Sequence, residues 1–192
     1  GAGFSPGGRA RGRGAVGALF LRGEVLRGAA PEERVREALA AADRCATEEE
    51  FKAELRRIKH REIARIAARD LSGIAPLPEV TADLSNLASA ALEAAVRFAG
   101  KALAARHGVP MAELPDGTRR PCRFVVMGMG KLGAHELNFS SDIDLLYLYE
   151  TDQGGTAGGE RPVPLHPYYA RLCEAVTRLV SEVTEDGFVF RV

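Results

Sequence analysis

A glycine-rich turn between two apolar segments constrains the fold of this chain most. The first segment, Arg123 to Met127, is typical of a strand and leads directly into Gly128-Met129-Gly130-Lys131-Leu132-Gly133. The second, Ile143 to Tyr149, begins about ten residues after Gly133 and is also predicted to be a strand. A parallel crossover needs about a dozen or more residues, most of them helical. The short connection therefore argues against a unit with two parallel strands.

The glycines have the spacing of the dinucleotide-binding fingerprint, Gly128-x-Gly130-x-x-Gly133. That fingerprint also requires a full helix, a parallel second strand and an acidic residue about twenty residues further on. Because the helix and the parallel strand do not fit into the connection, we reject dinucleotide binding as the function of this turn.

Two carboxylates at the start of the second strand are the candidate metal ligands. Side chains alternate along a strand, so Asp142 and Asp144 are expected on one face, about 6.5–7 Å apart. They repel by about 2–3 kcal/mol at an effective dielectric constant of 20, and a divalent cation between them would remove that repulsion. Oxygen ligands suit Mg²⁺, which also binds substrate phosphates. The alternative is a solvated strand edge or a turn, but acids that start a buried strand are costly unless they are paired or bind metal.

The turn and the two acids together predict phosphoryl-transfer chemistry. The glycines allow backbone N–H groups to approach phosphate oxygens, and Lys131 adds a positive charge. Two divalent ions a few ångströms apart can hold the attacking and leaving oxygens of an in-line displacement. We therefore predict a metal-dependent nucleotidyltransferase site.

Composition excludes several other classes of protein. The 192 residues carry 26 basic and 26 acidic side chains, so charge indicates neither a nucleic acid nor a membrane surface as partner. No apolar run is long enough to cross a bilayer. Cys45, Cys122 and Cys173 lie far apart, which argues against a zinc site or a disulfide framework and suits a reducing cytoplasm. The Gly/Arg-rich segment 1–28 is expected to be a flexible end rather than an anion-binding arm.

The region before Pro115-Asp116-Gly117, a turn signal, is expected to be helical. Thr47 and Glu50 have the spacing of a capping box. The segment 154–159 is too glycine-rich for a regular element, and 188–192 is expected to be a last strand. The expected helices run from Pro31 to about Cys45, from Thr47 to near Gly73, from Thr81 to Gly108 and from about Pro167 to Thr184.

A glycine-rich turn followed by Asp-x-Asp resembles the nucleotidyltransferase superfamily that includes DNA polymerase β. The string from Gly128 to Asp144, GMGKLGAHELNFSSDID, is similar to the glutamine synthetase adenylyltransferase/adenylyl-removing family, whose members are bifunctional. The segments 65–73 and 186–192 resemble the same family. The resemblance implies an α+β fold, with a helical bundle (29–114) after the flexible segment 1–28. A truncated polymerase-β-like nucleotidyltransferase core with a mixed sheet (115–192) would follow.

The resemblance assigns roles residue by residue. Asp142 and Asp144 would be catalytic metal ligands for Mg²⁺. The nucleotide (ATP or ADP) and orthophosphate would lie against the glycine-rich turn. The residues implied in nucleotide or phosphate binding are Gly128, Gly130, Lys131, Gly133, Ser140 and Ser141.

The implied activity is the removal of AMP from a tyrosine of glutamine synthetase by phosphorolysis, which releases ADP, and its attachment. The string 138–141 is more like the N-terminal, AMP-removing unit of the family. The implied partners are glutamine synthetase and the PII signalling protein, in the cytoplasm. Alternatives are a nucleotidyltransferase with a different acceptor and a non-catalytic docking or regulatory module. The family resemblance places a third carboxylate directly after the string 188–192, so the chain alone is expected to be inactive.

Overall fold

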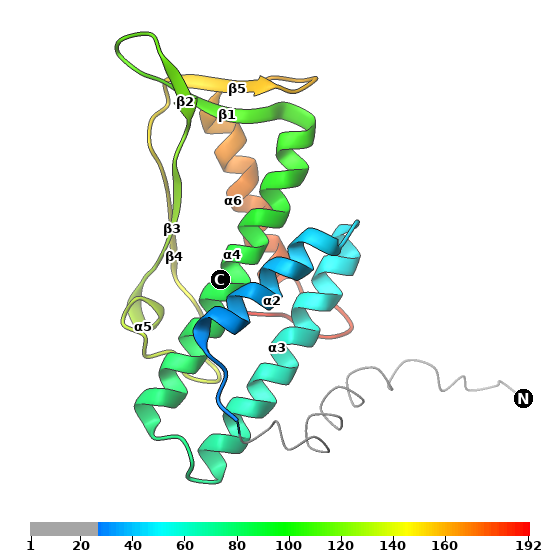
Figure 1. The fold of residues 1–192 in the computed structure, drawn as a ribbon, viewed down its shortest axis with the longest axis vertical. Coiled ribbons are helices and arrows are strands. Elements are labelled where there is room, and N and C mark those ends of the chain that lie inside the picture. Colours follow the sequence, from blue (N-terminus) through cyan, green and yellow to red (C-terminus); the bar gives the residue numbers. More distant parts are fainter. Residues whose placement is uncertain (1–26) are drawn as a thin grey trace, which may run out of the picture.

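The computed structural model of this chain describes residues 27–192, and the prediction for the segment 1–28 therefore lies almost wholly outside the described residues. Figure 1 shows an elongated molecule in which a long helix, α4, is flanked by helices on one side and by a β-ribbon on the other. Helices and two small sheets make the fold α+β, as predicted. The predicted division at residues 28 and 114 stays a prediction.

Three helices form the first half of the described chain: α2 (Pro31–Arg44), α3 (Glu48–Leu71) and α4 (Leu77–His107). The predicted capping box is confirmed, since Glu50 N donates to Thr47 Oγ1 at 3.2 Å and the Glu50 carboxylate accepts from Thr47 N. The start of α4 was predicted wrongly at Thr81. Its first turn begins four residues earlier because Pro78 lies there, where a missing N–H costs nothing.

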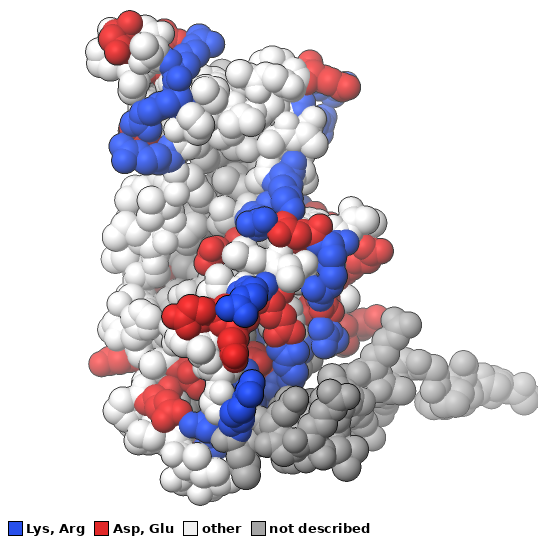
Figure 2. All heavy atoms as spheres, viewed as in Figure 1, with Lys and Arg blue, Asp and Glu red and all other residues white. Residues whose placement is uncertain are grey.

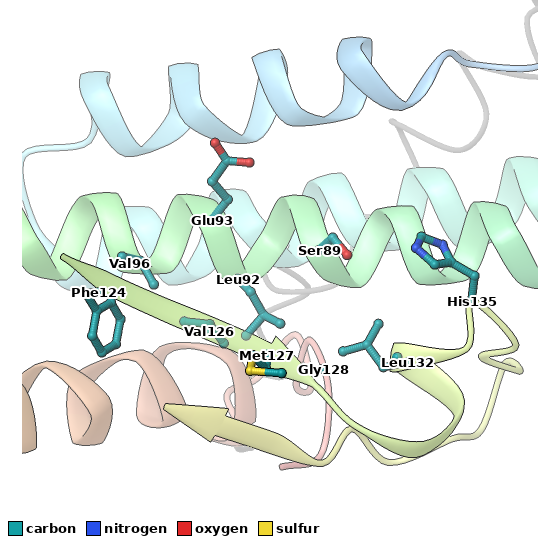
Figure 3. Close-up of a pocket in the computed structure, with 11 residues that line it drawn as sticks. Ser89, Leu92, Glu93, Val96, Phe124, Val126, Met127, Gly128, Leu132 and His135 are labelled. Carbon is teal, nitrogen blue, oxygen red and sulfur yellow. The ribbon is translucent and has the colours of Figure 1, made fainter. Parts of the chain in front are cut away.

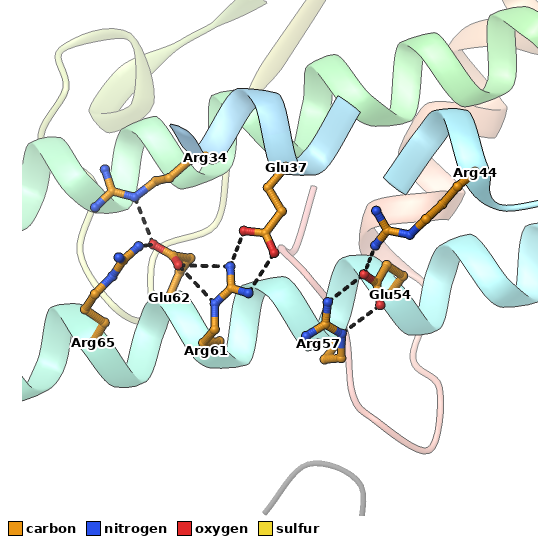
Figure 4. A network of polar contacts seen from close by, with 8 residues as sticks. All are labelled: Arg34, Glu37, Arg44, Glu54, Arg57, Arg61, Glu62 and Arg65. Carbon is orange, nitrogen blue, oxygen red and sulfur yellow. Dashed lines mark hydrogen bonds and ion pairs between the residues drawn. The ribbon is translucent and has the colours of Figure 1, made fainter. Parts of the chain in front are cut away.

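A buried ion-pair network joins these helices (Figure 4). The carboxylate of Glu62 on α3 contacts Arg34 Nε of α2 at 3.0 Å and also pairs with Arg65 and Arg61. Arg34 extends the network to α4 through Asp83, at 2.8 Å. Burial raises the pKa of Glu62, but the neighbouring guanidinium groups outweigh it and hold that pKa below its ordinary value. A buried carboxylate is tolerated here because it is paired, and the pairing fixes α2 against α3.

A three-stranded antiparallel sheet lies at the C-terminal end of α4. It consists of β1 (Gly108–Glu113), β2 (Arg119–Pro121) and β5 (Gly154–Gly158), in the order β2-β1-β5. The prediction of a loop over 154–159 was wrong. Glycine is needed in this strand because it approaches β1 closely: a Cβ on Gly154 would lie 2.2 Å from the backbone oxygen of Met111.

A two-stranded antiparallel ribbon, β3 (Phe124–Gly128) and β4 (Leu145–Tyr149), runs along α4. Its inner face packs on α6 (Leu165–Ser181), where the Tyr169 ring stacks on Phe124 and Tyr149 at centroid distances of 5.2 and 4.7 Å. Its outer face is apolar and exposed, and in Figure 2 the side over β3 and β4 is white while charges gather over α2 and α3. The exposed apolar residues of this face are Val125, Met127, Leu146 and Leu148.

The predicted mixed sheet is wrong, because every pair of strands in residues 27–192 is antiparallel. The predicted last strand, 188–192, is also wrong. The segment after α6 makes a turn over 184–187 and belongs to neither sheet, and it buries Val189 and Phe190. It is held from α3 by Arg56, whose fully buried guanidinium donates to the backbone oxygen of Gly187 at 2.7 Å and to that of Leu179 at 3.3 Å.

None of the helices that the structure describes has the length and apolarity to cross a membrane.

Candidate functional site

The two candidate metal ligands lie immediately before β4 rather than inside it, so the predicted strand start at Ile143 was two residues too early. Backbone hydrogen bonds nevertheless join these residues to two other parts of the chain. Met129 N donates to Asp144 O at 2.8 Å, and Ile143 N donates to Arg191 O at 2.9 Å. Asp142 and Asp144 therefore lie between the glycine-rich turn and the C-terminal segment.

Burial alternates along these residues. Ile143 is 1% exposed and faces the core, whereas Asp142 and Asp144 are both exposed. The alternation puts the two carboxylates on the side opposite Ile143. Their exposure removes the cost of burial as an argument for a metal, because solvated carboxylates are stable without one. The remaining argument is their shared side, where a cation could bind both.

The glycine-rich turn forms a single helical turn, α5 (Gly130–Gly133), between the strands. Gly130 has a φ of +52°, which glycine adopts without strain, and a Cβ built on it would lie 3.6 Å from Asp144 Oδ2. Gly133 allows the turn to close on β3, since a Cβ there would lie 2.5 Å from Gly128 O. The antiparallel pairing and the short helix agree with the rejection of dinucleotide binding. Gly130 therefore lies beside the Asp144 carboxylate, and the exposed Lys131 follows it in the chain.

Ser140 and Ser141 belong to a loop that is hydrogen-bonded within itself. Ser141 Oγ donates to Asn138 Oδ1 at 2.6 Å and accepts from Asn138 N at 3.2 Å. Ser140 N donates to the same Oδ1 at 3.2 Å. These contacts order the loop that precedes Asp142, and a contact of either serine with a nucleotide stays a prediction.

Sequence reasoning missed Arg191. Its Nε lies 2.5 Å from Asp142 Oδ1, and its Nη2 donates to Ser140 O at 3.0 Å. The pair is exposed, with the Arg191 and Asp142 side chains 59% and 63% accessible. Local sequence offers no signal for this contact, because it depends on how the segment after α6 returns to β4.

A cavity of about 550 Å³ lies between α4 and β3 (Figure 3). Gly128 and Gly133 line it, together with Leu92 and Val126, but Asp142 and Asp144 do not. The glycines of the turn therefore divide between two surroundings: Gly130 lies beside a carboxylate, and Gly128 and Gly133 lie beside the cavity. The structure does not bring all the predicted nucleotide-binding glycines to one place.

The donor set fits Mg²⁺ only in part. Among residues 27–192 there is no group of three or more His, Cys, Asp or Glu side chains that could hold a metal ion. Two exposed carboxylates on one side nevertheless match the way Mg²⁺ binds through one or two carboxylates, with water and substrate phosphates completing its shell. Asp142 and Asp144 would supply these ligands, and Arg191 would compete with the metal for the Asp142 carboxylate.

Comparison with known proteins points to one family. A family model described as glutamate-ammonia ligase adenylyltransferase matches residues 19–192. A bifunctional glutamine synthetase adenylyltransferase/adenylyl-removing enzyme from Thioalkalivibrio sulfidiphilus is 45% identical over 139 residues, which are 72% of this chain and 14% of that protein. Proteins of the same name from Ralstonia nicotianae and Pseudomonas aeruginosa are 43% and 39% identical, and cover 76% and 91% of this chain. The matched part is 15% and 17% of those two proteins, so the chain spans about a sixth of the length of these relatives.

Proposed function

Because this chain belongs to the glutamate-ammonia ligase adenylyltransferase family, we propose that it carries part of a nucleotidyltransferase site that acts on glutamine synthetase. The relatives are named for both attachment and removal of the adenylyl group, and the chain covers about a sixth of their length. The observation that carries the proposal is the position of Asp142 and Asp144, on one exposed side next to the glycine-rich turn.

We propose removal of AMP as the direction of the reaction, since the string 138–141 resembles the AMP-removing unit of the family. An oxygen of orthophosphate forms a bond to the phosphorus of the AMP group, and the bond from that phosphorus to the tyrosine oxygen breaks. The tyrosine oxygen takes up a proton, and the other product is ADP. Such a displacement needs positioning and charge neutralisation rather than a side-chain nucleophile.

The residues of this chain supply the positioning. Asp142 and Asp144 would hold Mg²⁺, which when bound neutralises the phosphate oxygens of the substrate. Gly130 keeps the backbone clear beside the Asp144 carboxylate, and Lys131 on the same turn offers a positive charge to an anionic substrate. The nucleotide, ATP or ADP, would bind on this side. The PII signalling protein as regulator and the cytoplasm as location belong to the same proposal.

The proposal is tested by ADP release from adenylylated glutamine synthetase, in the presence of orthophosphate and Mg²⁺. The measurement uses the longest form of the protein that contains this chain, as the parent sequence and as Asp142→Asn. We expect the variant to fold like the parent, because the side chain is exposed, and to release ADP at least about tenfold more slowly. Asp70→Asn, which removes an exposed charge on α3, is the matched control. ADP release by Asp142→Asn at the parental rate would contradict the proposal.

A further inference from the structure

Arg191 is the one cation whose ion pair with a candidate metal ligand is recorded among the described residues. Its guanidinium contacts the site twice, at Asp142 Oδ1 and at the backbone oxygen of Ser140. Its own backbone oxygen accepts from Ile143 N, so main chain and side chain hold the same short segment. Arg191 thus contacts the Asp142 carboxylate and places a positive charge beside it.

The pairing conflicts with metal binding. A carboxylate oxygen that lies 2.5 Å from a guanidinium nitrogen is partly neutralised, and a divalent cation brought to the same group would also be repelled by the arginine. Exposure keeps the contact weak and exchangeable, since an ion pair in water contributes little free energy. The arginine can therefore leave the carboxylate at small cost.

Once it has left the Asp142 carboxylate, the Arg191 guanidinium could bind a phosphate group. The planar guanidinium binds phosphate through two parallel hydrogen bonds, which a lysine cannot do. The Arg191 guanidinium carbon also lies 6.0 Å from the centroid of the Phe188 ring, so a second, uncharged partner for the cation is next to the Asp142 carboxylate.

We propose that Arg191 is an exchangeable counter-cation: it neutralises and positions Asp142 until a divalent cation binds, and it then binds an anionic phosphate group of the substrate. The inference rests on the proposed function, because it concerns the same carboxylates. It adds a positioning residue and predicts that cation binding and phosphate binding assist each other.

The test is calorimetric titration of the purified chain with Mg²⁺, as the parent sequence, Arg191→Gln and Arg119→Gln. Arg119 is a matched control, because it forms an exposed pair with Glu113 and its side chain is 60% accessible, close to the 59% of Arg191. Without phosphate, Arg191→Gln should bind Mg²⁺ roughly threefold to tenfold more tightly than the parent, whereas Arg119→Gln should bind like the parent. If Arg191 had only a structural role, Arg191→Gln should bind Mg²⁺ more weakly than the parent, because Asp142 would be less well positioned.

The second arm repeats the titrations with orthophosphate present, which affects free Mg²⁺ equally for all three proteins. We expect phosphate to raise the affinity of the parent and of Arg119→Gln for Mg²⁺, and to leave that of Arg191→Gln unchanged. Arg191→Lys keeps the positive charge but lacks the two parallel donors of the guanidinium. It should bind Mg²⁺ as weakly as the parent and lose most of the phosphate effect. This variant still tests the inference if Arg191→Gln folds poorly.

The inference would be overturned by Mg²⁺ affinity of Arg191→Gln equal to or below that of the parent, or by an intact phosphate effect in that variant. Such a result would leave the proposed function standing as long as Asp144→Asn still weakens Mg²⁺ binding. Unchanged Mg²⁺ binding in Asp144→Asn would instead remove the proposed function itself, whatever Arg191 does.

Discussion

Arg56 of α3 donates a hydrogen bond from Nε to the backbone oxygen of Gly187, 2.7 Å away and 131 residues later in the chain. The same buried guanidinium also donates to the backbone oxygens of Lys52, Leu179 and Glu182. The segment that Arg56 holds leads directly to Arg191, and Arg191 contacts Asp142. A helix of the bundle is thereby connected to the candidate site through the C-terminal segment.

Replacement of Arg56 should therefore destabilise the whole chain. Arg56→Met fills the space but removes the hydrogen bonds that the buried guanidinium donates to backbone oxygens, and we expect a loss of about 2–4 kcal/mol in the free energy of unfolding. Urea denaturation followed by circular dichroism measures it. Arg119→Met, on the surface, should change that free energy by less than about 0.5 kcal/mol. Equal stabilities of the two variants would show that the Arg56 contacts are dispensable.

Stability should also decrease in acid because of Glu48. The hydrogen bond from Arg178 of α6, assisted by Lys52, outweighs partial burial and lowers the pKa of Glu48 to about 2. Since the pKa is lower in the folded than in the unfolded chain, the stabilisation is complete above the unfolded value. It is lost as the pH falls from about 4.5 towards about 2.

Glu48→Gln should remove that part of the pH dependence. We expect the variant to be less stable than the parent at pH 7, by up to about 1 kcal/mol, and the difference to shrink below about pH 4.5 and be smallest near pH 2. Arg178→Gln should move the acid loss to higher pH, because the largest cause of the shift is gone. Thermal unfolding measured from pH 7 to pH 2 tests both. A constant difference between Glu48→Gln and the parent over that range would contradict the assignment.

The glycine-rich turn should tolerate a side chain poorly at Gly133. Gly133→Ala puts a Cβ 2.5 Å from the backbone oxygen of Gly128, so the backbone must shift, at a cost of about 1–3 kcal/mol. The shift also moves Asp144, which is hydrogen-bonded to the turn through Met129, and should weaken Mg²⁺ binding. Gly117→Ala is the control: a φ of +79° strains alanine but not glycine, and no atom lies within 4 Å of the added Cβ. Gly117→Ala should lose about 1–2 kcal/mol in the free energy of unfolding and keep the parental Mg²⁺ affinity. Parental Mg²⁺ affinity in Gly133→Ala would separate the turn from the site.

The 192-residue chain by itself should not release ADP from adenylylated glutamine synthetase. Residues 27–192 offer two carboxylates at the site and no cluster of three possible metal ligands. Two carboxylates can hold one Mg²⁺ weakly, but a clamp on both attacking and leaving oxygens uses two ions. A coupled assay for ADP with the purified chain tests this, with a full-length adenylyl-removing enzyme as positive control. Sustained ADP production would show that two carboxylates suffice.

Local patterns in the sequence predicted the features that depend on neighbouring residues. The capping box of Thr47 and Glu50 is such a feature, and so are the two strands on either side of the glycine-rich turn, whose short connection argued against a parallel pair. Nonlocal contacts escaped prediction. The glycines of 154–158 are typical of a loop, and they form a strand only because β1 pairs with them. The contact of Arg191 with Asp142 likewise depends on residues far apart in the sequence. The division of the turn glycines between a carboxylate and a cavity likewise depends on α4, which lies far away in the sequence.

The central claim is that Asp142 and Asp144 together bind a divalent cation. Its most direct measurement is Mg²⁺ titration of the purified chain as the parent sequence, Asp144→Asn and the surface control Asp70→Asn. We expect saturable binding to the parent and to Asp70→Asn, and binding at least about tenfold weaker in Asp144→Asn, because one of two ligands loses its charge. Mg²⁺ affinity in Asp144→Asn equal to that of the parent, or no saturable binding to the parent, would contradict the claim.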